Sequence, residues 1–242
     1  MALITTSVER LANGMSEGYL AGIIYLAPEK VAGNGINVCK FATDECKKVC
    51  LNTSGRGQMS KVQEARIKRT RWLMSDPESF YGAVSEEIHA LERKAKRLGL
   101  KPAIRLNGTS DIDHRGYIQL FNQFRLESGL DPMMWYDYTK HPTRALTNTD
   151  RFYHLTYSHG GLGTMDKTIR HIESGINATV VFSTKKGKPL PKHWNGFDVI
   201  DGDIHDLRFL DPKGVVVGLR AKGKAKQVTP VFNGFVNPDL ST

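Results

Sequence analysis

Cysteine is scarce in this sequence, and long apolar runs are absent from it. The 242 residues contain three cysteines, an odd number that favours metal binding or catalysis over a disulfide framework. No apolar stretch approaches the length that crosses a bilayer. Residues 1–7 lack the basic and apolar regions of a signal peptide. We therefore expect a cytoplasmic protein with reduced thiols and no membrane partner.

Acidic residues are outnumbered by basic ones. The chain has 34 Lys and Arg against 25 Asp and Glu, which gives a formal charge of +9 and a pI near 9.4. This excess suggests a polyanionic partner, with nucleic acid as the first candidate, and a merely basic surface is the alternative. The cations gather in residues 61–71, 185–192 and 213–226. We predict contacts to DNA phosphates from Arg56, Lys61, Arg66, Arg69, Lys185, Lys186, Lys222 and Lys224.

Short apolar runs alternate with amphipathic segments through most of the chain. Strands are predicted at 22–26, 103–106, 133–136, 152–157, 178–182, 197–200 and 215–219. Helices are predicted at 58–74, 76–98 and 117–127, and a further helix follows residues 160–164 and ends near residue 175. This alternation favours a single α/β domain over residues 1–242, a (β/α)8 TIM-like barrel. Because 139–151 and 183–196 show no helical pattern, the barrel is expected to be irregular or incomplete, and an open doubly wound sheet is the alternative.

Polar residues follow five of the predicted strands, at 107–114, 137–141, 158–161, 183–185 and 201–206. In parallel α/β folds the loops at the carboxyl ends of strands build the active site. Taken singly, most of these residues are typical helix caps or turn formers. Gly160 and Gly161 precede a predicted helix, where backbone N–H groups can approach a phosphate. The recurrence of polar residues at five strand ends nevertheless indicates an enzyme.

The three cysteines share one polar loop, residues 37–57, with six residues between Cys39 and Cys46 and three between Cys46 and Cys50. They could ligate Zn²⁺ together with a histidine or water. They could instead bind three irons of a 4Fe-4S cluster and leave the fourth open. Reduced structural thiols are disfavoured because the loop has few apolar residues. The candidate fourth ligands are His114, His141, His154, His159 and His205.

Several motifs resemble a family of bacteriophage proteins known as gene product 88. They are residues 18–28, the cysteine loop, 105–111, 136–140 and 199–203. The resemblance implies a phage-encoded protein in the host cytoplasm. Two other groups are similar more loosely. One is the tRNA-guanine transglycosylase-like barrels, including phage enzymes that put 7-deazaguanine into DNA (DpdA), with zinc and paired aspartates. The other is the radical S-adenosylmethionine enzymes, whose three cysteines follow the first strand.

Three hypotheses follow, and the first is a DNA-modifying transglycosylase. An aspartate displaces guanine from a flipped nucleotide, and a purine-like 7-deazaguanine derivative then replaces it. Its catalytic candidates are Asp111, Asp137, Asp201 and Asp203, with Asp201 or Asp203 as the nucleophile and Asp111 as its partner. Base-stacking or substrate contacts are expected from Asn107, Ser110, Tyr136, Tyr138, Lys140, Gly160 and Gly161. The second is a radical S-adenosylmethionine-like 4Fe-4S enzyme. The third is a non-enzymatic, metal-stabilised nucleic-acid-binding protein.

Overall fold

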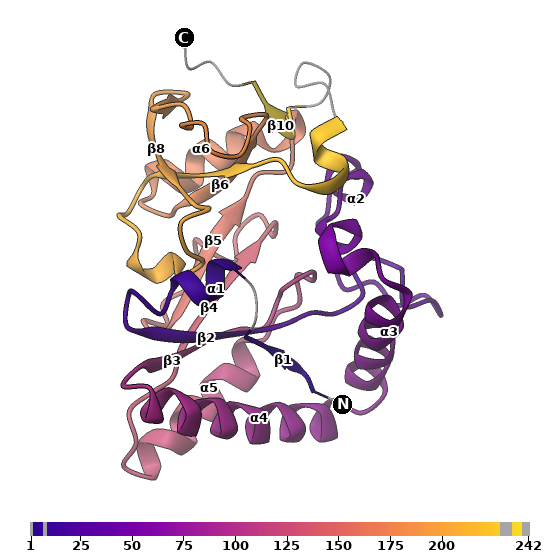
Figure 1. The fold of residues 1–242 in the computed structure, drawn as a ribbon, viewed down its shortest axis with the longest axis vertical. Helices are drawn as coiled ribbons and strands as arrows, with labels where there is room; N and C mark the ends of the chain where they lie inside the picture. The colour runs from indigo at the N-terminus through magenta and orange to yellow at the C-terminus, as the bar shows by residue number, and fades with distance from the viewer. Residues whose placement is uncertain (1, 7–8, 228–233, 239–242) are drawn as a thin grey trace.

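The computed structural model describes residues 2–6, 9–227 and 234–238, and Figure 1 shows their arrangement. The strands are β1 (Ile4–Thr5), β2 (Tyr19–Ile24), β3 (Lys101–Arg105), β4 (Met134–Thr139), β5 (Tyr153–Ser158), β6 (Ala178–Phe182), β7 (His193–Trp194), β8 (Phe197–Asp201), β9 (Val216–Arg220) and β10 (Val236–Asn237). The α-helices are α1 (Glu9–Asn13), α2 (Asp44–Lys48), α3 (Ser60–Ser75), α4 (Pro77–Arg97), α5 (Arg115–Glu127) and α6 (Met165–Glu173). Short 3₁₀ helices are η1 (Leu51–Thr53), η2 (Gly55–Gln58), η3 (Leu162–Thr164), η4 (Arg208–Leu210) and η5 (Gly223–Gln227). No helix within these ranges is long and apolar enough to cross a membrane.

Most neighbouring strands of the sheet run parallel to one another. Its strand order is β1-β2-β3-β4-β5-β6-β9-β8-β7, and the strands from β2 to β8 in this order are parallel. Ile104 and Trp135 pack with α4 and α5 on one face, and Tyr157 and Val180 pack with α6 on the same face. In Figure 1, α4 and α5 run below β2 and β3. The longer helices α4, α5 and α6 therefore lie on one face of the sheet.

The opposite, inner face of the sheet is covered by short irregular segments. Ala21, Ile23 and Tyr136 project from it and pack against Leu11 of α1 and Leu207. The side-chain amide of Asn13 donates to the carbonyl of Ile204 at 2.7 Å and so joins α1 to the segment after β8. Side chains of α1 and of the segment after β8 therefore cover this part of the inner face.

The described strands form an open, mostly parallel sheet and no closed eight-stranded barrel. β1 pairs antiparallel with β2 and occupies its outer edge, and β7 does the same for β8. No pairing between described residues joins the two ends of the path. To close the sheet into a barrel, a strand from its other end would have to pair with the outer edge of β2. β1 already occupies that edge.

The C-terminal strand β10 enters the sheet where β5 and β6 diverge. β5 pairs with the start of β6, at Ala178 and Thr179. β10 pairs with the end of β6, at Val181 and Phe182, while β9 occupies the other edge along its whole length. Residues 234–238 are thereby brought to the carboxyl ends of the parallel strands.

The seven strands predicted from the sequence are confirmed, with boundaries that differ by at most three residues. Asp76 caps α4 as expected, since its carboxylate accepts from the backbone N–H of Ser79 at 3.1 Å. Residues 139–151 and 183–196 contain no α-helix, also as expected. The sequence gives no sign of β1, β7 and β10, because two-residue strands are too short to show an alternating pattern.

The apolar stripe of α4 generates a test of the core. Ile88 is fully buried in the cluster that α4 forms with β2 to β5. Ile88→Ala is expected to lower the free energy of unfolding by about 2–5 kcal/mol, because it leaves a cavity. Lys94→Ala, on the exposed side of the same helix, should change it by less than about 0.5 kcal/mol. Urea unfolding followed by circular dichroism measures both, and equal losses would contradict this packing.

Candidate functional site

The cysteine loop, residues 37–57, follows β2 and crosses the carboxyl ends of the neighbouring strands. The carbonyl of Val38 accepts from the backbone N–H of Asp111, after β3, at 2.8 Å. Cys39 Sγ lies 3.6 Å from the carbonyl oxygen of Thr109 in the same segment. Thr43 Oγ1 donates to the carbonyl of Gly160, after β5, at 2.7 Å. These contacts fix the loop over the strand ends that the sequence marks as polar.

Thr43 and Gly160 hold the middle of the loop in place. Thr43 is the N-cap of α2, and its hydroxyl accepts from the N–H of Cys46 at 3.2 Å while it donates to Gly160. A Cβ at Gly160 would lie 2.8 Å from Thr43 Cγ2, so this close approach requires glycine. A Thr followed by Asp44 and Glu45 is an N-cap pattern that could have identified this helix in the sequence.

The C-terminal part of the chain packs against the end of the cysteine loop. Val49 forms one apolar cluster with Ala221, Ala225 and Val236. Ala225 belongs to η5 and Val236 to β10, so both elements lie beside the loop, as the position of α2 next to the C-terminal region in Figure 1 also indicates. The strand ends, the thiols and the C-terminal segments therefore meet in one region.

The thiols are partly buried and lie within electrostatic range of one another. The pKa of Cys39 is raised to about 12, chiefly by burial, which outweighs one backbone hydrogen bond that lowers it; the charges of Cys50 and Cys46 add to the rise. Burial also raises the pKa of Cys50, while Arg66 and Lys140 lower it. Without a cation these two groups are neutral thiols, and a bound metal would favour their thiolates.

No three His, Cys, Asp or Glu side chains within the described ranges converge to hold a single ion. A tetrahedral Zn²⁺ needs its ligands about 2.0–2.3 Å from one point. An iron–sulfur cluster differs, because each thiolate binds a different iron and the sulfurs stay farther apart.

Two of the candidate histidine ligands are engaged elsewhere. His159 Nε2 donates to the carbonyl of Gly234 at 2.9 Å, and its Nδ1 lies 2.9 Å from Thr168 Oγ1. His141 Nδ1 accepts from the N–H groups of Thr143 and Arg144 at 3.2 and 3.1 Å. The proton of the neutral His141 ring is therefore on Nε2, which leaves that ring no lone pair for a metal.

The remaining three candidates are placed as follows. His205 Nδ1 accepts from the N–H of Leu207 at 3.3 Å, His114 Nδ1 lies 2.8 Å from the Tyr81 hydroxyl, and His154 is on β5. Burial lowers the pKa of His114 to about 3 and that of His154 to about 4. These rings are neutral at pH 7.

The four predicted catalytic aspartates belong to three separate bonding networks. Asp111 pairs with Arg144 at 2.6 Å and accepts from Thr139 Oγ1 at 2.8 Å. Asp201 and Asp203 both pair with Arg220, at 2.8 and 3.3 Å. Lys222 also binds Asp203, at 2.8 Å. Arginine partners of this kind are not evident from the sequence, because Arg144 is 33 residues from Asp111.

Asp137 is enclosed on the helix-covered face. It is 1% exposed and accepts from the N–H of Asn107 at 2.7 Å and from the Tyr153 hydroxyl at 3.0 Å. Burial raises its pKa to about 7. The side-chain carbonyl of Asn107 in turn accepts from Ser110 Oγ and from the N–H of Ile112, at 2.8 and 2.9 Å. Asn107 and Ser110 therefore shape the loop after β3.

The predicted aromatic contacts are structural in this conformation. Tyr136 is fully buried, and its hydroxyl lies 3.5 Å from Asp206. The Tyr138 hydroxyl donates to Asp206 at 3.2 Å, and Arg105 pairs with Asp206 at 3.0 Å. The Arg105 guanidinium also lies 4.3 Å from the Tyr138 ring centroid. These residues form a buried polar group on the inner face, to which Asp206 contributes a role that the sequence does not reveal.

Lys140 and the glycine turn join neighbouring strand ends. Lys140 Nζ donates to Ser158 Oγ at 2.7 Å and to the carbonyl of His159 at 3.0 Å. The Gly160 N–H donates to Thr164 Oγ1 at 2.8 Å, and Gly161 has a φ of 111°. The Gly160 N–H is thus already bonded within the turn.

The predicted phosphate-binding residues differ in exposure. Arg66 is 7% exposed and lies 4.9 Å from the Tyr25 ring centroid, and Arg69 donates to the Tyr25 carbonyl at 3.4 Å. Both are directed into the protein. The exposed members are Arg56, Lys61, Lys185, Lys186, Lys222 and Lys224.

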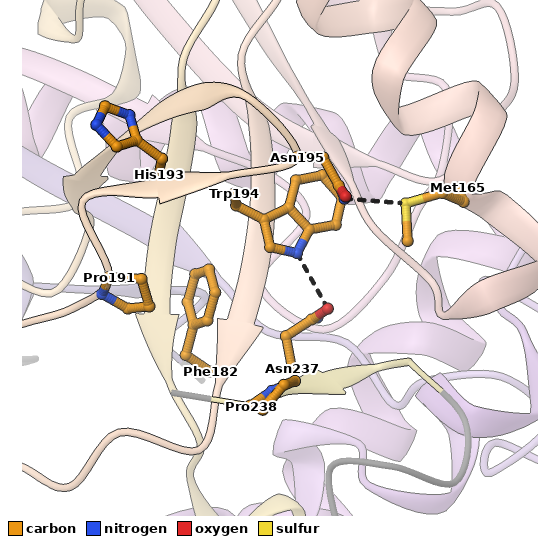
Figure 2. A pocket seen from close by; sticks show the side chains of 8 residues that line it. All are labelled: Met165, Phe182, Pro191, His193, Trp194, Asn195, Asn237 and Pro238. Carbon is orange, nitrogen blue, oxygen red and sulfur yellow. Dashed lines mark hydrogen bonds between the residues drawn. The ribbon is translucent and has the colours of Figure 1, made fainter. Parts of the chain in front are cut away.

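Two hollows lie near the C-terminal strands. The larger, about 650 Å³, opens at the ends of β6, β8 and β9 and is lined by lysines. The smaller, about 240 Å³, has largely apolar walls. Figure 2 shows the indole of Trp194 in this smaller pocket, with its N–H directed to Asn237 Oδ1 at 3.1 Å. Its side chains tie β7 to β10.

The buried carboxyl of Asp137 predicts a pH effect on stability. Its folded pKa of about 7 lies above the unfolded value of about 3.9, so its contribution to stability falls as pH rises through this interval. The melting temperature of the wild type should therefore decrease between about pH 5 and pH 8, and this decrease should be smaller in Asp137→Asn. Glu64→Gln, on the exposed side of α3, should leave that decrease as in the wild type. Parallel pH profiles for the wild type and Asp137→Asn would show that Asp137 is charged at low cost.

Comparison with known proteins gives one match. No curated protein and no solved structure matches the chain significantly. The family model described as gene product 88 matches residues 3–233. This range covers β1 through η5 and includes the cysteine loop and all the strand ends of the candidate site. The chain belongs to the gene product 88 family.

Proposed function

We propose that this protein is an iron–sulfur enzyme of the radical S-adenosylmethionine type that acts on nucleic acid. The observation that carries the proposal is the position of the cysteine loop. It follows β2, the first parallel strand, and crosses a sheet whose strands β2 to β6 stand in chain order. The radical S-adenosylmethionine resemblance implies this plan, with three cysteines in the loop after the first strand.

The donor set suits a 4Fe-4S cluster. Cys39, Cys46 and Cys50 are the only cysteines in the chain, and three thiolates would leave one iron open to a further ligand. A cluster of this kind supplies an electron to S-adenosylmethionine and so starts radical chemistry on a substrate. The engagement of His141 and His159 in other hydrogen bonds supports an open position over a histidine ligand.

The chain's own residues would position and tune the thiolates. Arg66 and Lys140 lower the pKa of Cys50 by their charge and so favour the thiolate. Thr43 holds the N–H of Cys46 and anchors the loop to the end of β5. Val49, packed against η5 and β10, screens the end of the loop from water.

Aspartate-dependent base exchange stays a competing prediction. A nucleophilic aspartate needs a free carboxylate oxygen directed at the substrate. Asp111, Asp201 and Asp203 are paired with arginine, and Asp137 is enclosed. Base exchange would require one of these pairs to open when substrate binds. The cluster hypothesis needs no such rearrangement.

Metal analysis of anaerobically purified protein tests the proposal. We expect about four iron and four sulfide per chain and absorbance at roughly 400 nm. Cys39→Ala, Cys46→Ala and Cys50→Ala should each abolish most of this iron. Asp111→Asn and Asp201→Asn should retain it, because these residues do not bind the metal. One zinc per chain with no iron after reconstitution would contradict the proposal and favour the transglycosylase hypothesis.

Thr43 provides a second test of the loop. Thr43→Val removes the hydrogen bonds to Gly160 and Cys46 and should lower iron retention several-fold after exposure to a chelator. Thr43→Ser keeps the hydroxyl and should behave as the wild type. Equal loss of iron in both variants, or in neither, would show that this anchor does not hold the loop.

A further inference from the structure

The larger hollow at the ends of β6, β8 and β9 has the chemistry of an anion-binding cleft. Its volume is about 650 Å³, within the usual range of ligand pockets. Five cationic and two acidic side chains line it. The acidic ones, Asp201 and Asp203, already pair with Arg220 and Lys222. The cleft therefore keeps a net positive charge after its own carboxylates are neutralised.

Two of its lysines are available to an incoming anion. Lys185 follows β6, Lys226 lies in the last turn of η5, and both are exposed. Neither pairs with a carboxylate within the described ranges. An anion between these walls would be contacted from two elements, which gives a more defined geometry than a flat basic surface.

Thr184 adds an unsatisfied hydroxyl to the same walls. The residue is 4% exposed, and its Oγ1 has no hydrogen-bond partner among the described residues. A buried hydroxyl without a partner costs about 1–3 kcal/mol, and a ligand oxygen would remove that cost. Since a hydroxyl can donate to a phosphate oxygen, Thr184 complements the lysines around it.

None of the described residues that line the cleft is aromatic, which argues against base stacking on them. Proteins contact nucleic-acid phosphates through Lys, Arg and hydroxyl groups, and these contacts carry no sequence information. Further exposed lysines continue the charge beyond the cleft, at Lys188 and Lys192 on the β6 side and at Lys224 on η5. Charge that extends past the cleft on both sides fits a strand better than a single phosphate.

We propose that this cleft binds the phosphodiester backbone of single-stranded nucleic acid without sequence preference. The inference rests on the proposed function and names the substrate class of the same site. The helix η5 connects the cleft to the cysteine loop, because Lys226 lines the cleft while Ala225 packs against Val49 beside Cys50. Gly223, with a φ of +55°, sits so close to Ser54 that a Cβ there would clash. A strand in the cleft would therefore lie next to the cysteine loop.

Fluorescence anisotropy with labelled 12-nucleotide DNA strands of two unrelated sequences tests the proposal. The double variant Lys185→Ala/Lys226→Ala should weaken binding of both strands at least about tenfold. It should also reduce the slope of log Kd against log salt by about 1.4, as expected for two lost phosphate contacts to a single strand. The control Lys94→Ala/Lys96→Ala removes the same charge at the far end of the sheet, where α4 leads into the start of β3, and should bind as the wild type.

Thr184 gives a test that does not depend on net charge. Thr184→Val should weaken strand binding several-fold at constant salt, and Thr184→Ser should restore it. Equal affinity in the cleft and control double variants would overturn the proposal. So would AMP or inorganic phosphate competing as tightly as the strand, because the cleft would then serve a free phosphate.

Iron content separates this inference from the proposed function. Both double variants should retain wild-type iron, so weaker strand binding with iron intact supports the cleft. A protein that binds no iron, yet loses strand affinity in the cleft variant only, would uphold the cleft and refute the cluster. A protein that holds iron but binds neither strand at low salt would refute the cleft alone.

Discussion

The parallel direction of the strands is the constraint on which the candidate site depends. Because β2 to β6, β9 and β8 run the same way, every loop after them emerges at one edge of the sheet. These loops include the cysteine loop and carry the arginine-bound aspartates and Lys140. They also form the lysine-lined cleft. Thr43 and Val49 then join the cysteine loop to segments that follow β5 and β9.

Charge pairing accounts for much of what surrounds this edge. Arg144 neutralises Asp111 near the ends of β3 and β4. Arg220 does the same for Asp201 and Asp203 at the ends of β8 and β9. Arg105 and Asp206 do the same on the inner face, beneath Tyr138. Truncating one partner of such a pair would leave an uncompensated charge, which costs more than the pair itself contributes. In the described conformation these carboxylates support the loops that carry them.

The sequence predicted the parallel strands well and the roles of single side chains less well. Seven strands and the Asp76 cap follow from local apolar runs and capping chemistry, which act over a few residues. The edges of the sheet were not predicted, because β1 and β7 are two residues long and carry no pattern. Arg66 shares the polarity of Lys61 in the sequence, yet it turns inward onto Tyr25. Its orientation depends on Asn52 and Tyr25, contacts that no local pattern encodes.

We propose that the three thiols and the strand ends form one metal-centred site. Anomalous diffraction at the iron absorption edge, from crystals grown without oxygen, tests it most directly. The account predicts one compact iron peak bonded to Cys39, Cys46 and Cys50, facing the ends of β3 and β5. A peak at other residues, or an anomalous zinc signal on these sulfurs instead, would contradict it.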